Sequence, residues 1–437
     1  MSDSIADFGE LTRGPLTRSI RGRRWARRVL LEKLNGLERG RLRLVEGGET
    51  VMLGRDAPRA GEPVATVQVH DQRFWPKILL GGSIGAGEGY MAGLWSTDDL
   101  TETLRFFLVN RSALESLDGG IGRLLMPLHR GLQLLRANTR RGSRRNIGAH
   151  YDLSNEFFEL FLDRHMMYSS AVFENADGED LGDDLEAAGE AKLERICRKA
   201  ELTADDHVLE IGTGWGGFAT WAASRYGCRV TTTTISKQQY EAACRRVREA
   251  GLEDRVEILR RDYRDLLRAQ QRYDKLVSIE MVEAVGHENL AQYFSVCSQL
   301  LKPHGRMVLQ GITIADRYLE TYRRSVDFIQ RYVFPGAALL SVSSMGEAVR
   351  RAGDLQVVHI EDIGPDYART LALWRRRFFE RIEDVRRLGF SETFVRLWDF
   401  YLCYCEAGFL ERTTGDLQVV LSKPEDRGRL LLGGLGP

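Results

Sequence analysis

The chain has 437 residues, with 62 lysines and arginines against 62 aspartates and glutamates. Its length predicts two or three domains of ~100–200 residues, each able to bury its own core. The zero formal net charge argues against a general nucleic-acid binder, because such proteins present a positive field to phosphates. A hydrophobic share of 43% excludes a disordered chain.

Cysteine and histidine patterns predict neither disulfides nor a metal site. The six cysteines are scattered, and only Cys403 and Cys405 lie close together, without a second pair to complete a zinc site. Sparse cysteines indicate free thiols in a reducing compartment. We find no run of about 20 apolar residues that could span a bilayer, and the acidic, apolar-poor start predicts no secretory signal. We therefore expect a cytoplasmic protein without a metal.

The N-terminal part, residues 1–135, is predicted to form a small α+β domain. Residues 13–28 are rich in arginine, with apolar residues at helical spacing among and after them. Such a basic amphipathic stretch either docks on an anionic membrane or packs as a solvated helix on its own domain. Residues 40–75 alternate in short β-like runs, and residues 81–100 look like a glycine-rich turn region that leads to a helix.

The rest of the chain is predicted to be an α/β domain over 151–437, after a linker at 136–150. From about 150 to 315, apolar or β-branched runs such as VLEIG and YDKLVSIE alternate with helical segments, which is typical of a parallel sheet. Beyond residue 316 the chain becomes helical and aromatic. We expect a helical region over about 316–412.

A glycine-rich turn gives the first functional signal. The buried strand Val208–Ile211 runs into Gly-Thr-Gly-Trp-Gly-Gly, residues 212–217, and then into a helix. Glycines in such a turn let the backbone approach a ligand closely. Dinucleotide enzymes use a similar device, so the turn alone also fits a purely structural strand–helix connection.

Three further features favour S-adenosylmethionine as the ligand. Glu210 lies just before the loop, where methyltransferases commonly place an acidic residue. The second strand ends in Thr-Ile-Ser-Lys-Gln-Gln, residues 234–239, in place of the acidic residue that binds ribose in NAD sites. The third strand ends at Arg261-Asp262-Tyr263, which offers a carboxylate and a ring for adenine. Together these features predict a Rossmann-like S-adenosylmethionine site.

Several blocks then occur in one order along the chain. They include NIGAHYDLSNEFFELFLDRHMMYSSAVF (146–173), LEIGTGWGG (209–217), SIEMVEAVGHENLAQYF (278–294) and GPDYARTL (364–371). Over about 145–425 these blocks resemble the cyclopropane fatty acid synthases and the related mycolic acid methyltransferases. GEGYMAGLW (87–95) resembles the longer bacterial members.

The resemblance implies C-methylation of a carbon–carbon double bond in an acyl chain, usually within a membrane phospholipid. The olefin attacks the sulfonium methyl and leaves a carbocation, which then loses a proton. The helical region would be an acyl-binding insertion in the methyltransferase domain. Carried over by motif, the cofactor contacts are Tyr168, Ser169, Gly212, Gly214, Thr234, Ile235, Gln239, Asp262 and Tyr263.

The resemblance also implies a bicarbonate ion that serves as the base. At the positions of its usual ligands this sequence has Ser170, Glu283, Gln310, Ile312 and Tyr367. A serine thus replaces the family's cysteine, and a glutamine replaces its histidine. Ser, Gln and Tyr still offer donors to an anion, but a neutral Gln does not titrate. Glu283 therefore either orients bicarbonate or itself takes the proton.

Two products follow from this chemistry. Direct loss of a methyl proton closes a cyclopropane, whereas a hydride shift before proton loss gives a methylene branch that can be reduced to a methyl branch. E-M-V-E-A-V-G (280–286) with Q-G-I-T (310–313) resembles the branch of the family that makes 10-methylene and 10-methyl fatty acids. The sequence leaves both products open.

An acyl chain must be drawn from the bilayer, so the resemblance implies a peripheral location on the inner face of the membrane. The expected partners are unsaturated phospholipid acyl chains and an anionic surface, where each Lys or Arg contributes ~1 kcal/mol. We expect residues 13–34 to dock there, and family members often dimerise. Two alternatives remain: an N- or O-methyltransferase of a small polar acceptor, and a lipid-binding protein whose site has decayed.

Overall fold

The computed structural model describes residues 19–117, 153–175 and 177–428. These residues fall into two compact units. Unit 1 contains residues 19–117, 324–333 and 382–413, and unit 2 contains all other described residues. The predicted linker at 136–150 lies outside the described residues.

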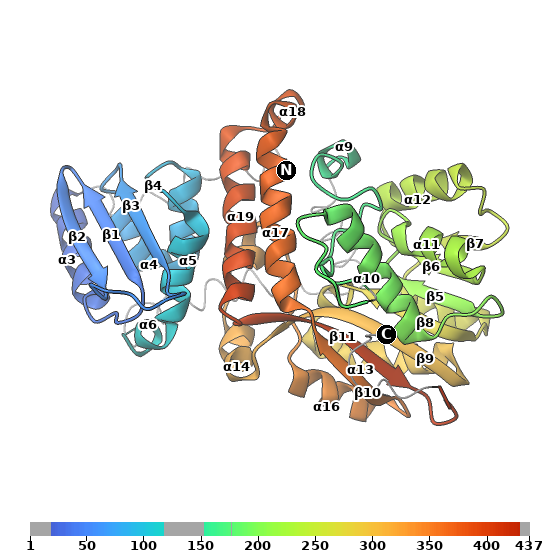
Figure 1. Ribbon diagram of the computed structural model, residues 1–437. Coiled ribbons are helices and arrows are strands. Elements are labelled where there is room, and N and C mark those ends of the chain that lie inside the picture. The colour runs from blue at the N-terminus through green and yellow to red at the C-terminus, as the bar shows by residue number, and fades with distance from the viewer. Residues whose placement is uncertain (1–18, 118–152, 176, 429–437) are drawn as a thin grey trace. The chain divides into compact units, whose positions relative to one another are not determined.

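Unit 1 combines a small sheet with helices, in agreement with the predicted α+β class (Figure 1). Its strands follow the order β2-β1-β3-β4, with β1 parallel to β3 and the other pairs antiparallel. The strands are β1 (Arg41–Glu46), β2 (Glu49–Gly54), β3 (Val64–Val69) and β4 (Trp95–Thr97). The helices are α3 (Ile20–Leu34), α4 (Phe74–Met91), α5 (Leu100–Val109), α6 (Arg111–Leu117), α15 (Phe328–Tyr332), α18 (Ile382–Arg387) and α19 (Glu392–Leu410).

The prediction of a glycine-rich turn region within residues 81–100 is wrong for most of that stretch. Helix α4 continues to Met91 and only kinks at Gly82, whose φ is 52°. The reason is packing, since a Cβ at Gly87 would clash with the ring of Phe328. Glycine there allows two segments of unit 1 to approach closely.

The predicted helical region 316–412 is divided between the units and contains one strand. Its segments 324–333 and 382–413 belong to unit 1. Residues Gln356–Asp362 form the edge strand β10 of unit 2. The β-branched run of this segment favours a strand. Among the described residues, no helix is long and apolar enough to cross a membrane.

In the described part of unit 2, seven strands form one sheet in the order β10-β11-β9-β8-β5-β6-β7 (Figure 1). The five strands from β9 to β7 are parallel, while β11 is antiparallel to β9 and β10 to β11. They are β5 (His207–Ile211), β6 (Arg229–Thr233), β7 (Val256–Leu259), β8 (Tyr273–Ile279), β9 (Leu301–Ile314), β10 (Gln356–Asp362) and β11 (Thr414–Ser422). The five runs predicted as parallel strands are confirmed.

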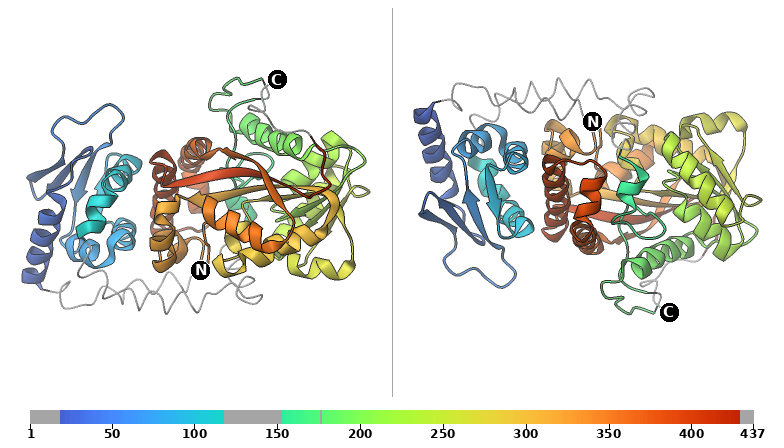
Figure 2. Two further views of the ribbon diagram at one scale, coloured as in Figure 1. Left: turned by 90° about the horizontal axis from the view of Figure 1, so that it is seen from below. Right: turned by 90° about the horizontal axis from the view of Figure 1, so that it is seen from above.

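Helices cover both faces of this sheet (Figure 2). Val308 and Val420 pack into a core with α10 and α11, whereas the next residues, Leu309 and Leu421, pack with α13 and α16. This alternation follows from the two-residue repeat of a strand. The helices are α9 (Asn155–Phe158), α10 (Leu185–Ala200), α11 (Gly217–Tyr226), α12 (Lys237–Glu249), α13 (Leu290–Leu300), α14 (Asp316–Arg324), α16 (Val342–Ala352) and α17 (Gly364–Glu380), with 3-10 turns η2 (Tyr263–Ala269), η3 (Val282–Ala284) and η4 (His287–Asn289). The Rossmann-like prediction is confirmed.

Candidate active site

The carboxyl ends of β5, β6 and β7 meet at one edge of the sheet, because these parallel strands are neighbours. Backbone bonds join them there. Gly212 N donates to Thr233 O at 3.0 Å, and Thr234 N donates to Leu259 O at 3.1 Å. The predicted cofactor residues from three separate strands are therefore brought to the edge where such sheets bind ligands.

The glycine-rich loop leaves room for a ligand. Gly212, Gly214 and Gly216 have φ values of 105°, 52° and 84°, in the range that favours glycine. A Cβ at Gly214 would meet no described atom within 4 Å, so the loop borders open space. Helix α11 begins directly afterwards, and its N-terminal end favours a carboxylate or another polar group of a ligand. This arrangement fits S-adenosylmethionine.

The second strand end is an ordered turn into helix α12. Thr234 Oγ1 donates to Gln239 Oε1 at 2.8 Å, and both side chains are buried. Ser236 caps the helix by accepting a bond from Gln239 N. Ile235 lies between them, half-buried. These bonds fix the turn so that its backbone faces the same strand edge as the glycine-rich loop.

The third strand end contributes a paired carboxylate and a ring. Asp262 is buried and accepts two bonds from the Arg264 guanidinium, the shorter at 2.6 Å. The Arg264 guanidinium also lies over the ring of Tyr263, 5.6 Å from its centroid. Tyr263 in turn packs edge-on against Tyr293. The bonds from Arg264 thus fix the orientation of the Asp262 carboxylate at the end of the third strand.

Glu210 lies inside the sheet rather than in the open space. Its Oε2 accepts a bond from Thr232 Oγ1 at 2.6 Å, and Thr232 Oγ1 lies 2.8 Å from Thr213 Oγ1. Burial raises the pKa of Glu210 to about 8, although the Thr232 bond and the charge of Lys192 lower it. Glu210 therefore acts on the glycine-rich loop through two threonine hydroxyls.

Replacing Glu210 by Gln should flatten the pH dependence of unit 2 stability. Between a pKa of about 4.5 in the unfolded chain and about 8 in the folded chain, only the folded state keeps this proton. Each pH unit in that window therefore lowers the wild-type free energy of unfolding by up to about 1.4 kcal/mol. Urea midpoints should fall less from about pH 5 to about pH 8 in Glu210→Gln than in wild type. Equal falls would contradict this account.

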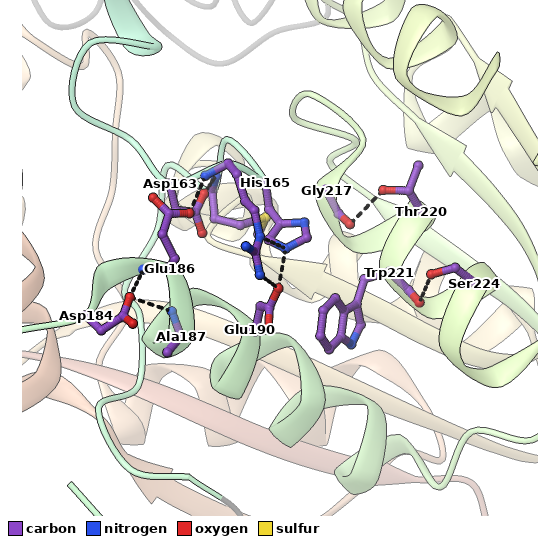
Figure 3. Close-up of polar contacts among 12 residues, drawn as sticks. Asp163, His165, Asp184, Glu186, Ala187, Glu190, Gly217, Thr220, Trp221 and Ser224 are labelled. Atoms are coloured by element: carbon purple, nitrogen blue, oxygen red, sulfur yellow. Dashed lines mark hydrogen bonds and ion pairs between the residues drawn. The ribbon is translucent and has the colours of Figure 1, made fainter. Parts of the chain in front are cut away.

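The segment 163–170, which carries three predicted site residues, packs on the start of α11 (Figure 3). Asp163 accepts a bond from the backbone N–H four residues later at 2.8 Å. His165 Nε2 lies 3.2 Å from Glu190 Oε1 of α10. A Cβ at Gly217 would clash with His165 O, so the segment rests directly on the first residue of the helix.

Ser169 is held by a buried lysine. Lys192 Nζ donates to Ser169 Oγ at 2.9 Å, and Lys192 is fully buried in α10. Burial lowers the pKa of Lys192 to about 8, while nearby carboxylates, first Asp163 and then Glu280, raise it. This amine is thus a positive charge placed between the cofactor edge and the carboxyls described below.

Tyr168 lies in an aromatic cluster. Its ring centroid is 5.1 Å from Phe158, 5.4 Å from Trp374 and 6.1 Å from Phe334. Trp374 lies 6.1 Å from Tyr367 on the same helix. Two of these partners come from beyond residue 316, where the sequence analysis expected rings for a cation. A well-placed ring face stabilises a cation by ~0.5–2 kcal/mol.

Tyr367 connects this cluster to a half-buried carboxylate, Glu280, that was not among the predicted site residues. Tyr367 OH donates to Glu280 Oε2 at 2.7 Å. Ser170 N and Gln310 Nε2 each donate to Glu280 Oε1 at 2.8 Å. Glu280 has a φ of 45°, a backbone conformation that is uncommon and strained for a non-glycine residue. The available signal was an acidic residue directly after the buried strand β8.

Two further carboxyls complete the cluster. Glu283 Oε1 accepts a bond from Ile312 N at 2.5 Å, and its buried Oε2 has no hydrogen-bond partner among the described residues. Asp416 Oδ2 accepts a bond from Gln310 Nε2 at 3.0 Å. Burial, together with the charge of Glu280, raises the pKa of Glu283 to about 8. The structure thus brings the five predicted catalytic residues, Glu283 among them, together with Glu280 and Asp416.

A comparison with known proteins places the chain in a family. The family model described as mycolic acid cyclopropane synthetase matches residues 138–419. The chain belongs to this family. The family resemblance seen in the sequence is therefore confirmed.

The alignments with three known proteins span most of the length of each of them. Tuberculostearic acid methyltransferase UfaA1 of Mycobacterium tuberculosis is 39% identical over 75% of this chain and 76% of that protein. The cyclopropane-fatty-acyl-phospholipid synthase of Escherichia coli is 34% identical over 84% of this chain and 90% of its own. The crystal structure of mycolic acid cyclopropane synthase CmaA1 with SAH and CTAB has a TM-score of 0.58 at 29% identity, covering 64% of this chain and 98% of that one.

The bicarbonate ion predicted for this member of the family does not fit the arrangement. The Ser170 hydroxyl donates to Ala171 O at 2.8 Å, and the Ser170 backbone N–H donates to Glu280. The other expected donors also bond to the chain's own carboxyls. A bicarbonate ion would therefore have to compete with Glu280 and Glu283 for these donors.

Proposed function

We propose that this protein is an S-adenosylmethionine-dependent C-methyltransferase that acts on the double bond of unsaturated acyl chains in membrane phospholipids. The observation that carries the proposal is the Glu280 carboxylate, held by three donors beside an aromatic cluster and the glycine-rich loop. Such a site offers a place for the cofactor, rings for a cation and an acceptor for a proton. The names of the acyl-chain enzymes UfaA1 and the Escherichia coli synthase support the substrate class.

The proposed mechanism assigns one task to each part of the site. S-adenosylmethionine, when bound, supplies an electrophilic methyl group on a sulfonium. The glycine-rich loop and segment 234–239 bind the cofactor, and Asp262 with Tyr263 binds the adenine end. The rings of Tyr168 and Trp374 stabilise the positive charge that develops on the acyl chain, by ~0.5–2 kcal/mol each. Small polar acceptors would have little use for these rings.

Glu280 is the proposed proton acceptor. Its Oε1 accepts two hydrogen bonds, whereas Oε2 accepts one described bond and therefore keeps a second lone pair for a proton of the transferred methyl group. Burial raises the pKa of Glu280, while the bonds from Tyr367, Ser170 and Gln310 and the charge of Lys192 lower it. Glu283, whose pKa is raised to about 8, stays protonated at neutral pH and does not fill this role.

The proposal is tested by incubating the purified protein and S-adenosylmethionine with liposomes of a mono-unsaturated phospholipid. Mass spectrometry of the fatty esters should show a gain of one CH2, and liposomes of a saturated phospholipid should show none. Mild hydrogenation then identifies the product, because a cyclopropane resists reduction and a methylene branch takes up hydrogen. No gain, with the cofactor shown to be bound, would contradict the proposal.

Helix α3 supports a peripheral location on the membrane. Ala26, Leu30 and Leu34 face the core of unit 1, whereas Ile20 and Trp25 are 63% and 44% exposed. The helical spacing places Ile20 and Trp25 about 140° apart, on either side of the exposed arginines. The part of the predicted docking segment before residue 19 lies outside the described residues. Exposed Trp and Ile side chains beside arginines are suited to the interfacial region of a bilayer.

Three exposed arginines on the same face should give most of the attraction to anionic lipid. Arg21, Arg24 and Arg28 lie beside Trp25 on this face. At ~1 kcal/mol per charge, replacing all three by Gln should weaken binding to anionic liposomes about 100-fold at low salt. Co-sedimentation over a series of lipid concentrations measures the change.

A variant with the same charge change provides the control. Arg245, Arg248 and Arg268 are exposed residues of unit 2. Replacing these three by Gln should leave liposome binding within a few-fold of wild type. If both triple variants lose binding equally, net charge rather than α3 drives the association, and the docking proposal fails.

A further inference from the structure

A row of buried polar side chains crosses the sheet of unit 2 on the face covered by α10. In the antiparallel register, Glu361 of β10 lies opposite Gln418 of β11, and Gln418 lies opposite Gln310 of β9. Lys199 reaches this row from α10, and Lys199, Gln418 and Gln310 are each 0% exposed. A buried polar side chain costs free energy unless it is hydrogen-bonded.

Lys199 sets the direction of the hydrogen bonds along the row. Its Nζ donates to Gln418 Oε1 at 2.6 Å and also to Glu361. An ammonium group has only donors, so Gln418 must present its oxygen to Lys199 and its amide nitrogen to the other side. Gln418 Nε2 then donates to Gln310 Oε1 at 3.0 Å.

Gln310 is therefore left with both N–H groups facing the active site. It donates to Glu280 Oε1 at 2.8 Å and to Asp416 Oδ2 at 3.0 Å. The two ends of an amide have nearly the same shape, so an amide can turn over within the same space. A turned Gln310 would place its oxygen against two carboxyls, which would weaken the ionised form of each.

We propose that Lys199 is a positioning residue for Glu280: through Gln418, it holds the Gln310 amide in the orientation that donates to the Glu280 carboxylate. The inference rests on the proposed function, in which Glu280 accepts the proton. Lys199 acts through two side chains and is not itself a catalytic residue.

Charged groups surround both ends of the row, and any test of the role of Lys199 must allow for them. The groups that face Lys199 are Glu361, Arg195, His359 and Asp416. The groups that face Glu280 are Lys192 from α10, Tyr367 from α17, Glu283 from η3 and Asp416 from β11. A useful pair of variants therefore breaks the Lys199–Glu361 ion pair in both proteins but removes the donor to Gln418 in only one of them.

Lys199→Met and Glu361→Gln form such a pair. Both break the ion pair between Lys199 and Glu361, but only Lys199→Met removes the donor to Gln418. In Lys199→Met, the acidic limb of the kcat profile should move up by about one pH unit, because Glu280 loses a charge-assisted bond. KM for S-adenosylmethionine should stay unchanged. In Glu361→Gln the limb should stay within a few tenths of a pH unit of wild type.

A second readout needs no turnover. Infrared difference spectra report the protonated carboxyl of Glu280 as the band that is lost in Glu280→Gln. Titration of this band should give a higher pKa in Lys199→Met than in wild type, and Lys199→Arg should restore the wild-type value. Equal shifts in Lys199→Met and Glu361→Gln, or no shift in Lys199→Met, would overturn the inference.

Gln418→Leu tests the same row without touching the ion pair. It should reproduce the shift of Lys199→Met, and the double variant should shift no further, because both act through one chain of bonds. This variant also decides the question if Lys199→Met does not fold. A wild-type protein that methylates no lipid, yet shows the infrared shifts, would refute the proposed function and not the positioning role.

Discussion

Glu280→Gln should abolish methylation of unsaturated lipid while cofactor binding persists. Glutamine keeps the shape of the side chain, and its one oxygen can still accept the bonds from Ser170 N and Gln310 Nε2. Its amide nitrogen cannot accept the bond from Tyr367 OH, and the amide cannot take up a proton. Loss of a general base lowers a rate by about 100- to 10,000-fold. We therefore expect kcat for lipid methylation to fall by this factor, measured as transfer of labelled methyl into the lipid extract.

Glu283→Gln is the matched control for this experiment. Its Oε1 can still accept the bond from Ile312 N, and the wild-type carboxyl is already protonated near neutral pH. We expect its rate to fall less than about tenfold. The opposite order of the two variants would make Glu283 the proton acceptor. Added bicarbonate should leave the wild-type rate unchanged, and a rate that rises with bicarbonate would contradict the internal carboxylate.

Gly214→Ala should weaken binding of S-adenosylmethionine by about 10- to 100-fold without unfolding unit 2. An added Cβ meets no described atom within 4 Å, so the folded chain can accommodate it. The same Cβ fills the open space in front of the loop where the ligand must approach the backbone. Isothermal titration measures the dissociation constant, and thermal unfolding reports the stability.

Gly182→Ala separates backbone strain from loss of the ligand space. Gly182 has a φ of 60°, close to the 52° of Gly214, and a Cβ there also meets no described atom within 4 Å. Both variants should lose a similar ~1 kcal/mol of stability from the left-handed backbone. Only Gly214→Ala should lose cofactor affinity. Equal affinity in the two variants would place the cofactor elsewhere.

Periodicity and motif order predicted the parts of the fold that depend on local patterns. The five runs of the parallel sheet and the glycine-rich turn were found because a buried strand, a turn and a helix each have a distinctive sequence pattern. Helix α4 was missed, since its glycines serve close packing on Phe328 rather than a turn. The membership of 324–333 and 382–413 in unit 1 depends on contacts between distant segments, which periodicity does not report.

The candidate site, too, was predicted only where a local motif identifies a residue. The family resemblance identified Ser170, Gln310 and Tyr367, but not the group that they bind. The role of Glu280 is visible only in the folded structure, because the donors that converge on it come from three separate segments. The role of Ser170 also changed, because its backbone N–H, and not its hydroxyl, faces the Glu280 carboxylate.

The most direct test of the account uses S-adenosylmethionine with a fully deuterated methyl group and liposomes of a mono-unsaturated phospholipid. The proposed function requires methyl transfer to carbon followed by loss of one hydrogen from that same methyl group. The modified acyl chains should therefore gain CD2, whether they carry a cyclopropane or a methylene branch. Retention of all three deuterium atoms on a nitrogen or oxygen of a polar acceptor, with unmodified acyl chains, would contradict it.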